Sequence, residues 1–149
     1  MFSSILWATD GSEHADRSLP FVEELARRFS AKILVVHVDQ RLGGRASGYS
    51  TLADEPELQA KIEAQTSHLA ALGFDATFRL ATRHTHGPAD AVADVARETG
   101  ADLIVVGSHG HGFLATTVGG SVTMRLVHIA PCPVFAVPVH AVVEEPALR

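Results

Sequence analysis

Five short apolar runs alternate with stretches of helical periodicity along this chain, and this alternation constrains the fold more than any other feature. The runs cover residues 5–8, 33–38, 76–81, 101–106 and 134–139. Strands that are separated by helices pair in parallel, and their helices cover both faces of the sheet. We therefore expect an α/β fold with an open, doubly wound five-stranded parallel sheet.

The helix signals between these runs are local. Ser12 is a suitable N-cap for a helix whose apolar positions extend to Phe29, but Pro20 falls inside that pattern. Because proline removes a backbone donor, we expect a distortion there or a later helix start. Further helices are expected at 58–72, from Pro88 to a C-cap at Gly100, and at 122–130.

Composition limits the class of protein. The chain has 149 residues, which suits a single domain over residues 1–149. A net charge of −5 argues against a nucleic-acid-binding face. There is no long apolar run or leader-like start, so we expect no membrane span and a cytoplasmic location. The lone Cys132 excludes an internal disulfide and is expected to be a buried, inert thiol.

Two segments lack strong periodicity. Residues 39–55 are rich in glycine and serine, and we expect a long mobile loop there, at about 40–55. The tail, at about residues 140–149, is expected to be flexible.

A glycine-rich segment lies between the fourth expected strand and the last expected helix. It reads Gly107-Ser108-His109-Gly110, then nine residues, then Gly120-Ser121. Backbone N–H groups in such a loop, together with a helix N-terminus, suit phosphate groups. The segment lacks the lysine of a P-loop, and it lacks the downstream acidic residue of a dinucleotide fingerprint. The alternative is a plain connection without a ligand.

Polar residues also follow the first strand, at Thr9 and Asp10. In a parallel sheet the ligand crevice lies at the carboxyl ends of the strands. The Asp10 carboxylate suits ribose hydroxyls or a metal held through water, and helix capping is the alternative. Val38, which ends the second strand, suits either an adenine ring or the core.

Catalytic patterns are weak. His84, His86, His109 and His111 stand in pairs without accompanying cysteines or paired carboxylates, which is typical of solvated rather than metal-binding histidines. The two lysines, Lys32 and Lys61, are not near the glycine segment in the sequence. A fast phosphate hydrolase needs positive charge on the leaving phosphate, so the sequence favours binding over turnover.

Taken together, these motifs resemble the universal stress protein family. Gly107, Gly110, Gly120 and Ser121 match the spacing Gly-x2-Gly-x9-Gly-Ser/Thr of its nucleotide-binding members. Residues 5–12, 101–110 and 130–134 resemble its first strand and Asp-Gly-Ser turn, its fourth strand, and the entry to its last strand. The similarity extends over about residues 3–138.

The resemblance implies a strand order of 3-2-1-4-5 and a homodimer that pairs through the last strand, expected from Val134 to Val139. It implies ATP as the ligand and allows a divalent ion, Mg²⁺ or Mn²⁺, beside the phosphates. Asp10 would hold the ribose and Val38 the adenine, and Thr9 and Ser108 would also belong to the nucleotide site. The residues around the phosphates would be Gly107, Gly110, His111, Gly120, Ser121 and Val122.

Many family members carry arginine or lysine where this chain has His111, and this difference would weaken phosphate attraction or favour ADP or AMP. The function that the resemblance implies is that of an ATP-binding regulatory dimer that responds to stress or energy state. The alternatives are a slow ATPase or nucleotidyl transferase, and a dimeric interaction module with a vestigial pocket.

Overall fold

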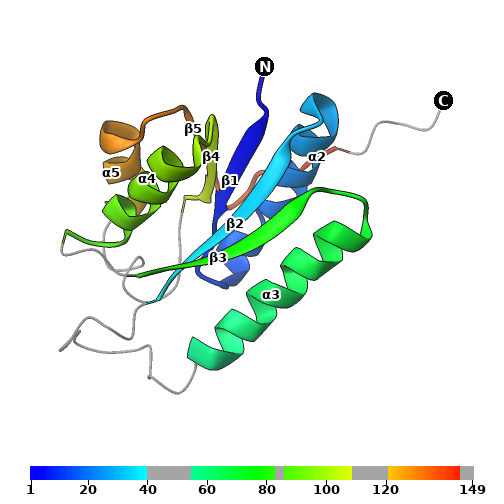
Figure 1. Ribbon diagram of the computed structural model, residues 1–149, viewed down its shortest axis with the longest axis horizontal. Coiled ribbons are helices and arrows are strands. Elements are labelled where there is room, and N and C mark those ends of the chain that lie inside the picture. The colour runs from blue at the N-terminus through cyan, green and yellow to red at the C-terminus, as the bar shows by residue number, and fades with distance from the viewer. Residues whose placement is uncertain (40–54, 83–85, 109–120, 145–149) are drawn as a thin grey trace.

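A five-stranded, all-parallel sheet forms the centre of the molecule, with the order β3-β2-β1-β4-β5 (Figure 1). The computed structural model describes residues 1–39, 55–82, 86–108 and 121–144. The strands are β1 (Ser4–Ala8), β2 (Lys32–Asp39), β3 (Ala76–Thr82), β4 (Leu103–Gly107) and β5 (Val134–Val137). The predicted fold class and strand order are confirmed.

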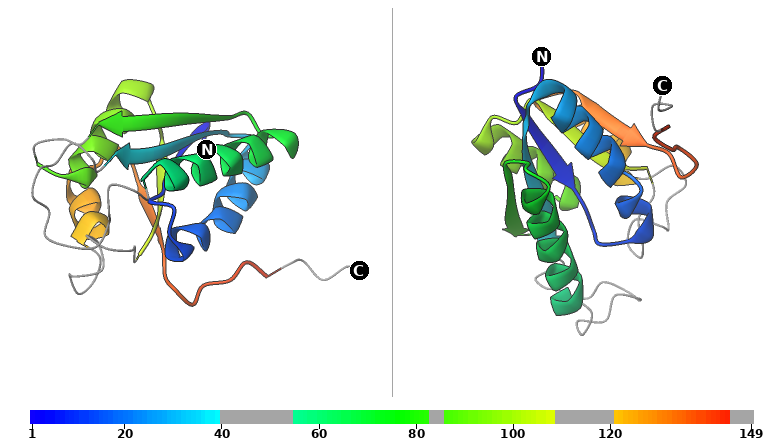
Figure 2. Two further views of the ribbon diagram at one scale, coloured as in Figure 1. Left: turned by 90° about the horizontal axis from the view of Figure 1, so that it is seen from below. Right: turned by 90° about the vertical axis from the view of Figure 1, so that its right-hand side faces the viewer.

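Helices cover both faces of this sheet. They are α1 (Glu13–Asp16), α2 (Leu19–Phe29), α3 (Glu55–Ala71), α4 (Pro88–Thr99) and α5 (Ser121–Ile129). Buried residues of α2 and α3 pack on one face, and Figure 2 shows both helices on the same side of the sheet. Buried residues of α4 and α5 pack on the other face. The chain therefore winds from β1 in both directions, which makes the fold doubly wound.

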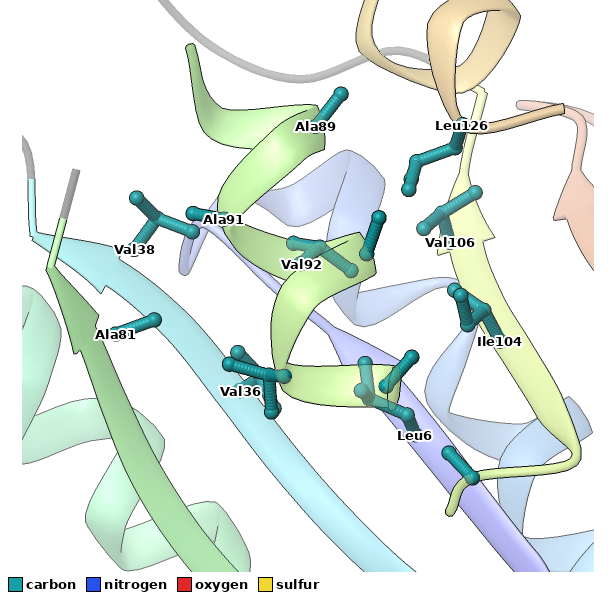
Figure 3. Packing of buried hydrophobic residues seen from close by; sticks show 14 residues of the cluster. Leu6, Val36, Val38, Ala81, Ala89, Ala91, Val92, Ile104, Val106 and Leu126 are labelled. Atoms are coloured by element: carbon teal, nitrogen blue, oxygen red, sulfur yellow. The ribbon is translucent and has the colours of Figure 1, made fainter. Parts of the chain in front are cut away.

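The two cores follow from the alternation of side chains along each strand. Ile5 and Trp7 face α2 and α3, whereas Leu6 faces α4. In Figure 3, Leu6, Val36 and Ile104 from three neighbouring strands lie beneath α4. All of these side chains are at most 1% exposed. Because the central strands are buried on both faces, their sequences are almost continuously apolar.

The first helical segment is interrupted where Pro20 predicted a distortion. Ser12 caps α1, and its Oγ accepts a hydrogen bond from the Ala15 N–H at 3.1 Å. This helix ends at Asp16, and α2 starts at Leu19 with Pro20 in its first turn. Proline is tolerated there because the first N–H groups of a helix have no partner within the helix.

Several boundaries differ from the predicted ones. β5 ends at Val137 rather than at 139, since Pro138 has no N–H to extend the ladder. β4 begins at Leu103 rather than at 101, because the Ala101 N–H still bonds to the last turn of α4. The ends of the expected 39–55 loop are also wrong: Asp39 belongs to β2, and Glu55 begins α3. Residues 40–54, and the tail beyond 144, lie outside the described residues.

Asp102 connects the amino ends of two strands. Its Oδ2 accepts hydrogen bonds from Ser3 N at 2.9 Å and Ser3 Oγ at 2.7 Å, and its Oδ1 accepts one from Ser4 N at 3.1 Å.

The single cysteine, Cys132, is only partly buried, which corrects the expectation of a buried thiol. Burial still raises the pKa of Cys132, and the charge of Asp102 raises it further. In the described part of the chain, no helix has the length and apolarity to span a bilayer.

Candidate functional site

The point where the strand order reverses lies between β1 and β4. Ala8 is the register partner of Val106, so Thr9, which follows β1, lies beside Gly107, the last residue of β4. From here the chain continues from β1 to helices on one face and from β4 to α5 on the other. In open parallel sheets, this is where a crevice forms for a ligand. The structure thus brings Thr9, Asp10, Gly107 and Ser108 together, as the sequence predicted.

The turn after β1 is held by one hydrogen bond to β2 and by others within itself. The Thr9 N–H donates to Val36 O at 3.0 Å, and the Thr9 hydroxyl accepts from the Gly11 N–H at 3.1 Å. Asp10 Oδ1 accepts from the Ser12 N–H at 2.9 Å, which is an Asx turn. Since Ser12 is the helix cap, Asp10 does not have that role. Asp10 is only partly buried.

Gly107 has a reason for being glycine that involves no ligand. A Cβ at this position would lie 2.8 Å from the carbonyl oxygen of His14 and 3.3 Å from Ala15 Cα. Both are backbone atoms of α1, so α1 approaches β4 closely only because residue 107 has no side chain. The glycine segment is thus fixed at its start, where the Ser108 N–H also donates to Val137 O at 2.9 Å.

The start of α5 lies against this end of β4. The Thr123 hydroxyl donates to Gly107 O at 3.3 Å, and Val122 packs, partly buried, on the core beneath α4. Ser121 is the first residue of α5. The helix N-terminus therefore follows the glycine segment, as the sequence predicted. Gly110, His111 and Gly120 lie outside the described residues, and so does the side chain of Ser121.

Val38 is a core residue. It is 8% exposed and packs with Ala81, Ala91 and their neighbours beneath α4 (Figure 3). The core interpretation of this residue is therefore correct, and an adenine contact stays a prediction. Of the four histidines considered as metal ligands, only His86 is described, and it is exposed. The described residues contain no cluster of three or more side chains suited to a metal ion.

Two side chains that the sequence did not indicate contact the Asp10 turn, His37 and Lys61, and a third, Glu55, contacts His37. His37 Nδ1 lies 3.0 Å from the Thr9 carbonyl oxygen, and His37 Nε2 lies 2.5 Å from Glu55 Oε1. Lys61 Nζ donates to the Gly11 carbonyl oxygen at 2.7 Å. The absence of lysine near the glycine segment in sequence therefore does not mean that lysine is distant from the site. These contacts span 18 to 50 residues, and no local pattern indicates them.

Comparison with known proteins agrees with the fold. The family model "Universal stress protein family" matches residues 1–138. A universal stress protein of Thermus aquaticus is 33% identical over 140 residues, which cover 92% of this chain and 99% of that protein.

Two solved structures have similar folds. A universal stress protein in complex with cAMP has a TM-score of 0.68 and 25% identity, and covers 91% of this chain and 97% of its own. The universal stress protein from Archaeoglobus fulgidus in complex with dAMP has a TM-score of 0.65 and 26% identity, with the same coverage of both chains. The family match over nearly the whole chain and the shared fold lead to one conclusion: this chain belongs to the universal stress protein family.

Proposed function

We propose that this protein, a single domain over residues 1–149, binds an adenine nucleotide in the crevice between β1 and β4. Asp10 accepts hydrogen bonds from ribose hydroxyls, and Thr9 and Val38 lie on the adenosine side. Residues of the glycine segment and the start of α5 surround the phosphates: Gly107, Ser108, Gly110, His111, Gly120, Ser121 and Val122. The observation that carries the proposal is the juxtaposition of the Asp10 turn and Gly107 at the strand-order reversal.

The ligands of the two similar structures support the adenine nucleotide class. One structure holds cAMP and the other dAMP, and both ligands combine adenine, a pentose and a phosphate. ATP with Mg²⁺ or Mn²⁺ is the ligand that we propose for this chain, and ADP and AMP are the competitors that His111 favours. A neutral histidine attracts a triphosphate less than the arginine or lysine of other members does.

The output that we propose is regulatory: nucleotide binding changes the association with partners in response to stress or energy state. Asp10 Oδ1 already receives the Ser12 N–H, and Lys61 already donates to Gly11 and to Asp16. Both groups therefore already have structural partners in or beside the Asp10 turn. This arrangement suits binding better than hydrolysis.

Calorimetry on ligand-stripped protein tests nucleotide binding. ATP, ADP and AMP are titrated with and without Mg²⁺ into the wild type and into Asp10→Ala. The matched control is Asp75→Ala, because Asp75 is a surface carboxylate at the opposite, amino end of β3. At a ligand concentration 100 times the Kd, nucleotide should stabilise the wild type by about 2.7 kcal/mol. Absence of both heat and thermal shift at millimolar nucleotide would refute the proposal.

We further propose that the protein is a homodimer that pairs through β5. Among the residues that the structure describes, β5 pairs only with β4, so it is an edge strand of the sheet. Phe135 on this strand is 38% exposed, and an edge with exposed apolar residues favours pairing with another strand. Sedimentation analysis tests this proposal: Phe135→Glu should give monomers, whereas Val142→Glu, at a 76% exposed residue outside the strand, should not. A monomeric wild type would refute it.

A further inference from the structure

We propose that His37, Glu55 and Lys61 are positioning residues for Asp10, and that affinity for the ribose of a nucleotide depends on them. They act from the face that α2 and α3 cover, and they hold the two peptide carbonyls on either side of Asp10. The inference rests on the proposed function, since it deepens the role of Asp10 in binding a nucleotide.

The carbonyl before Asp10 is held by a buried pair. His37 is 2% exposed and Glu55 3% exposed. A carbonyl oxygen only accepts hydrogen bonds, so His37 Nδ1 must carry the hydrogen that points at Thr9 O, 3.0 Å away. Nε2 then faces Glu55 Oε1 at 2.5 Å. His37 thus connects the Thr9 peptide to the first residue of α3, and loss of Glu55 leaves a buried nitrogen unpaired.

The carbonyl after Asp10 is held by the next turns of α3. Lys61 Nζ lies 2.7 Å from Gly11 O and 2.6 Å from Asp16 Oδ2, and Gln65 Nε2 lies 2.9 Å from Asp16 Oδ1. The helix is close enough that a Cβ on Gly11 would lie 2.9 Å from Leu58 Cδ2. Gly11 also has a φ of +77°, a conformation that glycine adopts without strain.

Between these two fixed carbonyls, the Asp10 carboxylate has little freedom. Its Oδ1 receives the Ser12 N–H, so any rotation of the Thr9 or Gly11 peptide moves the turn that orients it. A carboxylate that is oriented before a ligand arrives avoids the entropy cost of being ordered on binding. Removal of the α3 contacts should therefore weaken the ribose contact although none of these side chains needs to touch the ligand.

The chain offers a matched control for Lys61. Its other lysine, Lys32, forms an ion pair with Asp75 at 3.9 Å at the amino ends of β2 and β3, opposite to the site. Lys61→Met and Lys32→Met remove the same charge and keep a similar chain. For the buried pair, Glu55→Ala removes the partner of His37, and Glu55→Gln is the rescue variant. A glutamine amide can donate to Nε2 while Nδ1 keeps its hydrogen.

The affinities for AMP and for 2′,3′-dideoxy-AMP are measured by calorimetry. Lys61→Met and Glu55→Ala should raise the Kd for AMP about tenfold, equivalent to about 1.4 kcal/mol, and leave the Kd for the dideoxy analogue unchanged. Glu55→Gln should restore most of the affinity, and Lys32→Met should bind as the wild type does. In an Asp10→Ala background, Lys61→Met should cause no further loss, because both changes remove the same contact.

Amide hydrogen exchange of Gly11 and Ser12 in the ligand-free protein is the second readout. Both N–H groups are hydrogen-bonded within the turn, so Lys61→Met should speed their exchange relative to Lys32→Met. Unchanged exchange together with an unchanged Kd would overturn the inference, as would equal losses of affinity for AMP and for the dideoxy analogue. A wild type that binds no nucleotide refutes the proposed function, and the exchange rates then decide whether α3 holds the turn.

Discussion

Gly107→Ala tests whether the first glycine of the nucleotide motif is required for packing. The added Cβ would lie 2.8 Å from the carbonyl oxygen of His14 and 3.3 Å from the Cα of Ala15. These are backbone atoms, so no side-chain rotation relieves the contact. The φ of Gly107 is not in the left-handed region, so the strain expected from the described residues comes from the contact with α1. We expect α1 to be displaced from β4, with a loss of stability in the absence of any ligand.

Two opposing effects determine how much Gly107→Ala changes the free energy of unfolding. Overpacking a well-packed site costs roughly 1–3 kcal/mol. Replacing glycine by alanine restricts the unfolded chain and returns about 0.4–1 kcal/mol. The net loss should be about 1–2 kcal/mol. Urea unfolding of the ligand-free protein measures it through Trp7, which is the only tryptophan of the chain and is 0% exposed.

Gly100→Ala is the comparison variant. Gly100 ends α4 with a φ of +68°, and a Cβ there would have no atom within 4 Å. The Gly100→Ala substitution should lower stability only because alanine is strained in this left-handed backbone conformation, by about 1–2 kcal/mol. The stabilisation that alanine gives by restricting the unfolded chain is to be subtracted from this value, as for Gly107→Ala. Nucleotide affinity should be unaffected at Gly100, whereas at Gly107 stability and affinity should fall together. A ligand-free Gly107→Ala protein that is as stable as the wild type would refute the packing argument.

Three further outcomes are expected. Burial raises the pKa of Asp102, but hydrogen bonds from two N-terminal serines outweigh it and hold the pKa below its ordinary value. The stability that the carboxylate adds is thus complete above about pH 4 and lost as pH falls through the lower folded pKa, so in urea titrations the gap between wild type and Asp102→Asn should shrink only below about pH 4. Cys132, whose pKa is raised, should react with iodoacetamide at pH 7 more slowly than free cysteine does; an equal rate would contradict its burial. Ser18→Ala removes the acceptor of the Trp7 Nε1–H at 2.7 Å and should cost about 1–3 kcal/mol in urea unfolding; an unchanged midpoint would show that the bond adds nothing.

The sequence was sufficient for the fold because its signals are local. The central strands are apolar runs, and two helix boundaries have a residue with a clear conformational preference. Pro20 marked the start of α2, and Gly100 marked the end of α4. The predicted strand ends were wrong where the hydropathy of a run favoured a longer strand than the neighbouring residues and contacts allow. Hydropathy extends the last run to Val139, but Pro138 ends the ladder, and Arg17 donates to the Val139 carbonyl outside the strand.

The site was only partly predictable for a different reason. Residues that follow a strand, such as Asp10 and Gly107, are recognisable because the parallel topology brings strand ends together. His37, Glu55 and Lys61 reach the same turn through contacts that depend on how α3 packs on the sheet. A histidine inside a strand and a lysine inside a helix have ordinary surface or core roles in most sequences. Only the packing shows that both point at carbonyls next to Asp10.

The topology explains why α3 has access to this turn. β1 lies between β4 and β2, so the turn after β1 borders the glycine segment on one side and the end of β2 on the other. The chain that leaves β2 returns to β3 through α3, which covers the same face as α1 and α2. The start of α3 therefore reaches the carboxyl edge of the sheet, where Glu55 meets His37. If Asp10 binds the ribose as we propose, substitutions in α3 should change nucleotide affinity through Asp10 while the glycine motif stays intact.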